Sequence, residues 1–204
     1  MSEVSAAQVR ELRDQTGAGM MDCKQALAES GGDLQKAIVS LREKGLAAAA
    51  KRSARVASEG LVGSYIHVGG KIGVLIEVNC ETDFVARTPE FQALVKDLAM
   101  QVAAASPRWV RREEIPASTI ETERSIYRAQ ASGSGKPPAV IEKIVDGKLV
   151  KFFADTCMLE QPFIKDPQRT VGQLVTDSIA KIGENIVVRR FARFQLGELT
   201  ETAA

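Results

Sequence analysis

Few residue types in this chain could carry out covalent chemistry. Its 204 residues include three cysteines (Cys23, Cys80 and Cys157) and one histidine, His67. A cysteine nucleophile needs a nearby base, and a structural zinc site needs clustered Cys or His ligands. The cysteines are odd in number, far apart and outside any Cys-x-x-Cys pattern, which also argues against a disulfide framework. We expect three buried or half-buried thiols, no metal ligand set and no cofactor.

The spacing of His67 and Cys80 argues against a cysteine hydrolase. Residues 62–68 and 72–78 show strand-like alternation on either side of a Gly-Gly pair, a pattern typical of a β-hairpin with a tight turn. In the register that this turn sets, His67 lies opposite Ile72, near the turn, and Cys80 lies at the far end of the second strand. At ~3.3 Å per residue, His67 and Cys80 are roughly 25 Å apart. The sequence offers no other histidine as a base.

A phosphate-binding loop also fails on its sequence context. The stretch 132–138 contains Gly135 and Lys136, but Pro137 follows the lysine where the motif needs Ser or Thr. No strand is expected before it, so we predict an ordinary loop. The sequence also lacks Gly-x-Ser-x-Gly and the glycines of a dinucleotide site. These observations together predict a binding or regulatory protein and not an enzyme.

The overall charge gives no case for a nucleic acid or an anionic membrane as a direct partner. Lys and Arg number 27 and Asp and Glu number 26, so no global field favours polyanions. No apolar run approaches the roughly 20 residues that span a bilayer. The first residues lack the basic and then apolar order of a signal peptide. We expect a cytoplasmic protein.

Residues 1–45 are expected to form a three-helix docking bundle. Ser5 and Gln8 have the pattern of a capping box, and Gly17 is placed to end the first helix. A second helix ends at a Gly-Gly pair, an aspartate caps the third, and Gly45 is expected to terminate it. Three short helices bury only a small core, which suits docking onto a partner better than enclosing a substrate.

Residues 46–58 are expected to form a helical basic linker. They are rich in Ala, a strong helix former, and they include Lys51, Arg52 and Arg55. The basic side chains either form a solvated face or contact an acidic surface of a partner. The residue pattern leaves both interpretations open.

Residues 59–204 are expected to form an α+β core. A strand at residues 185–194 should join the hairpin, which gives a three-stranded antiparallel sheet packed with helices. Residues 118–160 should form a helical insertion, with a capping box that begins at Ser118 and a helix end at Asp146 and the glycine after it. So small a sheet leaves edges that a second copy could cover, so this core is also the expected dimerisation domain.

The stretch 78–85 separates the alternating pattern of a strand from the periodic pattern of a helix. Phe84 lies in this break, and the next helix is expected to start later, at Thr88 and Pro89. The Phe84 ring is either a buried staple or a probe presented to a partner. The residue pattern alone does not decide between them.

Three segments at the start, middle and end of the chain resemble the signatures of one family. They are residues 12–24 (LRDQTGAGMMDCK), 78–86 (VNCETDFVA) and 182–191 (IGENIVVRRF). Their sequences and order resemble those of translation elongation factor Ts. Because the segments span the chain, the resemblance covers essentially all of it.

The resemblance implies an exchange factor for elongation factor Tu, a GTPase. It implies that residues 82–85 dislodge the magnesium ion from the GDP-bound GTPase, with the Phe84 ring as the wedge. The bundle would resemble ubiquitin-associated domains and dock on the GTPase's nucleotide-binding domain. The implied magnesium-dislocating residues are Thr82, Asp83, Phe84 and Val85, and the expected docking residues are Leu12, Gly19, Met20 and Met21.

Two further expectations concern assembly and the alternative function. Many members of the family are longer, with a duplicated half of the core, so a homodimer would supply the half that this short form lacks. The single sheet and the apolar end of its last strand (Phe191, Ala192 and Phe194) motivate this hypothesis. The alternative function is a non-catalytic adaptor whose bundle binds a ubiquitin-like protein or RNA.

Overall fold

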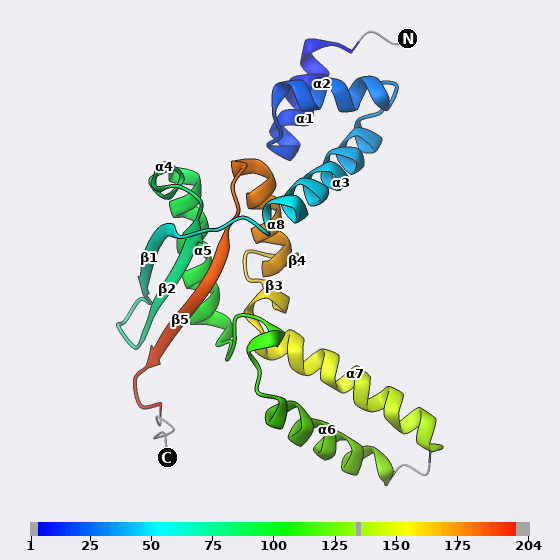
Figure 1. The fold of residues 1–204 in the computed structure, drawn as a ribbon, viewed down its shortest axis with the longest axis vertical. Coiled ribbons are helices and arrows are strands. Elements are labelled where there is room, and N and C mark those ends of the chain that lie inside the picture. The colour runs from blue at the N-terminus through cyan, green and yellow to red at the C-terminus, as the bar shows by residue number, and fades with distance from the viewer. Residues whose placement is uncertain (1–3, 134–135, 199–204) are drawn as a thin grey trace.

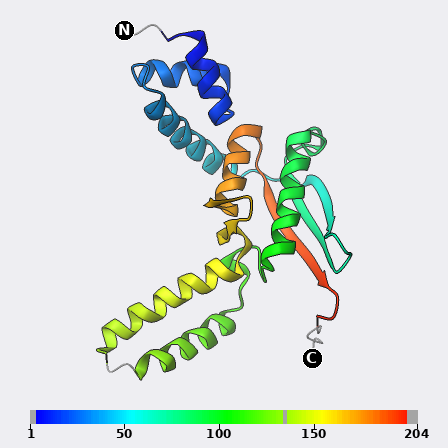
Figure 2. The same cartoon turned by 180° about the vertical axis from the view of Figure 1, so that it is seen from behind.

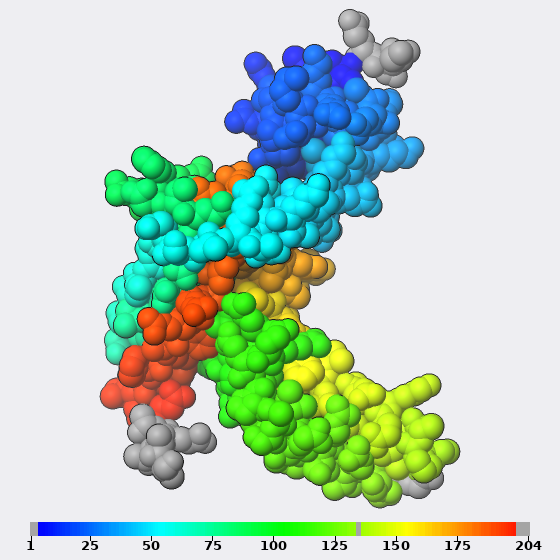
Figure 3. All heavy atoms as spheres, in the orientation of Figure 1, coloured from blue at the N-terminus to red at the C-terminus, as the bar shows by residue number. Residues whose placement is uncertain are grey.

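The structure is a computed structural model that describes residues 4–133 and 136–198. An N-terminal helical bundle, a central α+β core and a projecting helical hairpin follow one another along the molecule (Figure 1). In the space-filling view the bundle and the hairpin extend from opposite ends of the core (Figure 3). Ser134 and Gly135, which belong to the loop predicted at 132–138, and residues 1–3, which bear on the absence of a signal peptide, lie outside the described residues.

The bundle consists of α1 (Ala6–Thr16), α2 (Met20–Glu29) and the first half of α3 (Leu34–Arg52). The predicted caps are confirmed. Ser5 and Gln8 form a capping box, Gly17 ends α1 with φ 68°, and the Asp33 side chain accepts a hydrogen bond from the Lys36 N–H. The helices share a small buried core composed of Val9, Leu12, Cys23, Ala26, Leu27 and Ala37.

Helix α3 does not end at Gly45, so that expectation was wrong. The helix runs on to Arg52, and only residues 53–58 of the expected helical linker lie outside it. Gly45 serves close packing instead, because a Cβ at this position would lie 3.2 Å from the Ala180 Cβ of α8 (Val171–Ile182). Ala49, one turn farther on, is buried in the main core. One helix therefore joins the bundle to the core.

The core contains the predicted three-stranded antiparallel sheet, which confirms the α+β class. Its strands are β1 (Glu59–Ile66), β2 (Ile72–Cys80) and β5 (Val187–Gln195), in the order β1-β2-β5. The predicted hairpin register is also confirmed, since the His67 N–H donates to the Ile72 carbonyl oxygen at 2.9 Å. His67 and Cys80 therefore lie at opposite ends of the hairpin.

Helix α5 (Pro89–Ala105) packs along one face of the sheet, and α8 completes the same core (Figure 2). Thr88 caps α5 and Pro89 occupies its first turn, as predicted. The two helices and the inner face of the sheet enclose one apolar cluster. Its largest fully buried members are Phe91, Ile76, Leu98, Met158, Val74, Val78, Val95 and Val102.

Helices α6 (Ala117–Ser132) and α7 (Pro138–Thr156) form the projecting hairpin. The expected helix end at Asp146 and Gly147 was wrong, because α7 continues through both residues. The Asp146 carboxylate instead pairs with Arg124 of α6 at 3.4 Å, so it faces the neighbouring helix. Ser118 does not cap α6 either, since the helix already begins at Ala117.

Short elements lead from the hairpin back to the sheet. They are η1 (Arg112–Glu114), η2 (Met158–Glu160), β3 (Pro162–Phe163) and β4 (Asp166–Thr170). The last two pair as a small antiparallel sheet that the sequence pattern did not indicate. Within the described residues, no helix combines the length and apolarity needed to cross a membrane.

Gly147 offers a direct test of the continuous α7 helix. A Cβ added there meets no atom within 4 Å, and Ala is a better helix former than Gly. We therefore expect Gly147→Ala to raise the free energy of unfolding by roughly 0.5–1 kcal/mol, measured by urea denaturation. Gly183→Ala is the matched control. Gly183 has φ 89°, so that variant should lose about 1 kcal/mol or more. Destabilisation by Gly147→Ala would contradict an uninterrupted helix.

Candidate partner-binding site

The segment between β2 and α5 presents one large apolar ring to solvent. Residues Asp83–Ala86 form a single helical turn, α4, and the Thr82 hydroxyl oxygen caps it by accepting the Val85 N–H at 3.4 Å. Phe84 is 78% exposed, whereas the Val85 side chain is half-buried and packs against the main core. Phe84 is therefore not a buried staple, whereas Val85 attaches the turn to the core.

Asp83 is not an unpaired carboxylate. Its Oδ2 atom lies 2.8 Å from the Arg87 guanidinium, one helical turn away. Both side chains are substantially exposed, and exposed pairs at this spacing contribute only about 0.3–0.5 kcal/mol. A partner could therefore separate this pair at little cost.

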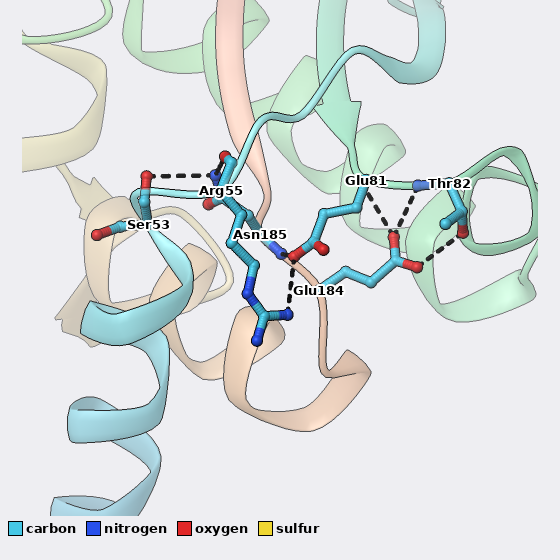
Figure 4. A network of polar contacts seen from close by, with 6 residues as sticks. All are labelled: Ser53, Arg55, Glu81, Thr82, Glu184 and Asn185. Atoms are coloured by element: carbon cyan, nitrogen blue, oxygen red, sulfur yellow. Dashed lines mark hydrogen bonds and ion pairs between the residues drawn. The ribbon is translucent and has the colours of Figure 1, made fainter.

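The carboxylate of Glu184 holds the chain just before α4 (Figure 4). One oxygen accepts the backbone N–H groups of Glu81 and Thr82 at 3.1 and 3.0 Å, and the other accepts the Thr82 hydroxyl at 2.7 Å. Hydrogen bonds to a charged acceptor are among the stronger ones in proteins. The position of Thr82, and with it the start of α4, is therefore fixed from outside the segment.

Asn185 and Glu81 extend this polar network to the chain segment that follows α3. The Asn185 N–H donates to Glu81 Oε1 at 2.6 Å, and its side-chain amide donates to the carbonyl oxygens of Arg55 at 2.7 Å and Ser53 at 3.4 Å. An ion pair of 3.5 Å joins Arg55 to Glu81. Residue patterns alone do not single out the contacts of Glu184 and Asn185, because their partners are more than 100 residues away in the chain. The sequence gives one signal for these residues: Glu81 lies in one of the segments that resemble family signatures, and residues 184–185 lie in another.

The expected docking residues separate into one buried and three exposed positions. Leu12 was expected to contact the partner directly, but it is fully buried in the bundle core. Its role is therefore to support the packing of the three helices. Gly19 precedes α2 and is exposed. Met20 and Met21, at the start of α2, are 43% and 75% exposed, which leaves apolar surface at that helix end.

All three cysteines are free and buried, as the sequence predicted. Burial raises the pKa of the Cys80 thiol, and the Glu184 carboxylate raises it further. Burial, followed by the nearby Glu160 charge, likewise raises the pKa of Cys157. The Cys80 Sγ donates to the Thr82 carbonyl oxygen at 3.1 Å. Cys80 is therefore a protonated hydrogen-bond donor that supports the same segment.

Within residues 4–133 and 136–198, no group of three or more His, Cys, Asp and Glu side chains is arranged to hold a metal ion. The acidic residues near α4 are engaged with N–H groups and Arg side chains instead.

Comparison with known proteins gives the same family over nearly the whole chain. A family profile described as Elongation factor TS matches residues 5–198. The chain belongs to the elongation factor Ts family. Elongation factor Ts of Geobacter sp. (strain M21) is 65% identical over 195 residues, which cover 96% of this chain and 90% of the relative. Elongation factor Ts of Anaeromyxobacter sp. (strain Fw109-5) is 64% identical over 198 residues, which cover 97% and 90% respectively.

Membership of the elongation factor Ts family settles the class of function. Elongation factor Ts is the nucleotide exchange factor for elongation factor Tu, and it is not an enzyme. The family assignment therefore favours the exchange factor over the adaptor and the cysteine hydrolase. The matches cover 90% of these relatives, so the chain spans most of their length.

The raised thiol pKa values predict low cysteine reactivity in this elongation factor Ts. At pH 7 the native chain should react with a chromogenic disulfide reagent far more slowly than free cysteine does, because all three thiols are buried. All three should react at once in denaturant. Since the pKa values of Cys80 and Cys157 lie above the ordinary 9.0, the reaction rate of these two thiols should keep rising with pH past 9.0, in step with the thiolate fraction, before it levels off. One rapidly labelled cysteine at pH 7 would instead point to an activated nucleophile.

Proposed function

We propose that residues 82–85 of this elongation factor Ts form a wedge segment that opens the magnesium site of GDP-bound elongation factor Tu. The observation that carries the proposal is the exposed Phe84 ring on a short helix anchored to the end of β2. An aromatic ring loses little rotamer entropy when it enters a pocket, and such residues dominate many interfaces. Thr82 and Val85 hold the ring in place, and Asp83 brings a carboxylate beside it.

The exchange follows from linkage between the two ligands of the GTPase. GDP and magnesium support each other, because the ion bridges phosphate oxygens and protein groups. A wedge that favours a conformation with a broken ion site weakens GDP binding by some factor. GDP must then weaken binding of the exchange factor by the same factor. A transient ternary complex forms, and GDP leaves without any bond being made or broken.

The N-terminal bundle is proposed to dock on the nucleotide-binding domain of the same partner. Gly19, Met20 and Met21 provide an exposed, largely apolar surface for this contact, and flexible Met side chains adapt well to a partner surface. The bundle and α4 lie at the same end of the core (Figure 1). One GTPase could thus contact both. The cytoplasm, where translation takes place, is the proposed location, with no membrane and no direct nucleic-acid partner.

Phe84→Ala tests the wedge. With this variant, we expect elongation factor Tu to release fluorescent GDP at about one tenth of the unaltered rate or below. Truncation of a central aromatic contact commonly costs that much. Release is followed by the loss of fluorescence at a fixed concentration of the exchange factor. Val68→Ala is the matched control, because Val68 is also exposed but lies at the hairpin turn, away from α4. An unchanged release rate with Phe84→Ala would refute the wedge role.

We also propose a homodimer formed through the outer face of the sheet. The strand register aligns three rows across this face: Val62, Glu77 and Arg190; Ser64, Leu75 and Ala192; and Ile66, Gly73 and Phe194. Apart from the Glu77–Arg190 ion pair, these rows are largely apolar, and Val62, Ile66, Leu75 and Phe194 are all exposed. The sheet faces the viewer in Figure 1, with α5 behind it. Phe191 points to the opposite side and packs on the core.

Light scattering with Leu75→Glu tests this dimer. The unaltered chain should have twice the mass of one chain, and the variant should have the mass of one, because each copy would bring a carboxylate into the apolar interface, where an unpaired charge is costly to bury. Val150→Glu on the α7 helix introduces the same charge at an exposed apolar position and should remain dimeric. A single-chain mass for the unaltered protein at micromolar concentration would contradict the proposal.

A further inference from the structure

Two consecutive residues connect both partner-binding parts of the molecule. Glu184 and Asn185 lie between Gly183, which ends α8, and the first residue of β5. Figure 4 shows their side chains directed to different segments: Glu184 to the chain before α4, and Asn185 to the chain that leaves α3. The first segment leads to the Phe84 ring, and the second comes from the docking bundle.

The α4 turn depends on anchors outside itself. It has only four residues, and an isolated turn of helix is unstable because nucleation is costly. On its N-terminal side the anchor is Glu184, which accepts three hydrogen bonds from Glu81 and Thr82. The Thr82 hydroxyl, oriented by donating to Glu184, can then accept the Val85 N–H. Without the carboxylate, two backbone N–H groups and this hydroxyl lose their common acceptor.

Asn185 performs the corresponding role for the segment after α3. Its side chain is buried, at 3% exposure, and its amide donates to the backbone carbonyl oxygens of Ser53 and Arg55. Its own N–H donates to Glu81, so the same residue touches the chain next to Thr82. Buried polar groups in a fully bonded network fix one arrangement, because any other leaves them without partners.

We propose that Glu184 and Asn185 are positioning residues for nucleotide exchange, with Glu184 setting the orientation of the wedge segment and Asn185 setting the position of the docking bundle relative to it. The proposal rests on the proposed function of Phe84. Each residue acts through the segment it holds. Loss of the Glu184 anchor lowers the fraction of bound complexes in which Phe84 is correctly oriented, which lowers the maximal release rate. Loss of the Asn185 anchor lowers the fraction of molecules competent to dock at both places, which weakens apparent binding.

The test measures GDP release from elongation factor Tu over a range of concentrations of the full-length exchange factor. The maximal rate and the half-saturating concentration are obtained separately, in the manner of kcat and KM. We expect Glu184→Ala to lower the maximal rate about tenfold and to change the half-saturating concentration less than about threefold. Glu184→Gln, which keeps one acceptor oxygen, should recover part of the rate. Asn185→Ala should raise the half-saturating concentration about fivefold or more and largely keep the maximal rate.

Glu113→Gln is the matched control for charge. Glu113 is an exposed carboxylate in η1, outside the network, so its variant should match the unaltered chain in both quantities. Circular dichroism and denaturation midpoints verify folding of each variant. If Glu184→Ala does not fold, Glu184→Gln decides the question, with a reduced maximal rate expected.

Phe84→Ala in the same assay separates failure of this inference from failure of the wedge. If Phe84→Ala slows release but the folded Glu184 variants keep the full maximal rate, the positioning role is overturned and the wedge stands. Equal losses in both quantities for the Glu184 and Asn185 variants would also overturn it, because a general loss of structure predicts no such division. Unchanged release with Phe84→Ala would remove the proposed function, and this inference with it.

Discussion

A phenylalanine ring that stands in water must be held by its backbone, because no packing holds the side chain. This constraint explains much of the arrangement around α4. Leaving the Phe84 ring exposed forgoes roughly 1.5–3 kcal/mol of burial, so the ring itself adds little to the stability of the fold. The surrounding residues fix the backbone of the turn that carries the ring. Strand β2 leads directly into this turn, Glu184 holds Thr82, and Val85 packs against the main core. The apolar core and the polar network thus serve one exposed side chain.

The same need for fixed geometry explains the long α3 helix. An exchange factor makes no covalent bond, so its contribution is to place surfaces at defined positions on another protein. Helix α3 contributes Ala37 to the bundle core and Ala49 to the main core. Its close crossing of α8 at Gly45 and Ala180 admits only small side chains. A continuous helix anchored at both ends restricts the bundle more than a flexible linker would.

Local patterns predicted local structure well. The capping residues at Ser5 and Thr88, the glycine turn of the hairpin and the alternation of its strands all gave the observed elements, because each signal lies within a few residues of the structure that it specifies. The sheet followed from three strands with compatible patterns. The family resemblance, and not the pattern alone, pointed to Phe84 as a partner contact.

The errors and omissions concern tertiary contacts. Gly45 and Gly147 resemble helix ends in sequence, but packing against α8 and pairing with α6 keep both helices continuous. Leu12 was expected to contact the partner, yet it is fully buried, because it packs between the three helices of the bundle. The hydrogen bonds of Glu184 and Asn185 join segments more than 100 residues apart, and no spacing rule could reveal them.

The α6–α7 hairpin is joined to the rest of the molecule at one end only (Figure 1). Its length is therefore nearly independent of the geometry at α4. Insertions or deletions in matched helical turns would change how far the hairpin projects, while the sheet and the polar network kept their positions. The short connection from α8 to β5 has no such freedom, since one added residue would displace Glu184 or Asn185 from its partners. Evolution can thus vary the reach of one end of this protein while the other end stays fixed in length.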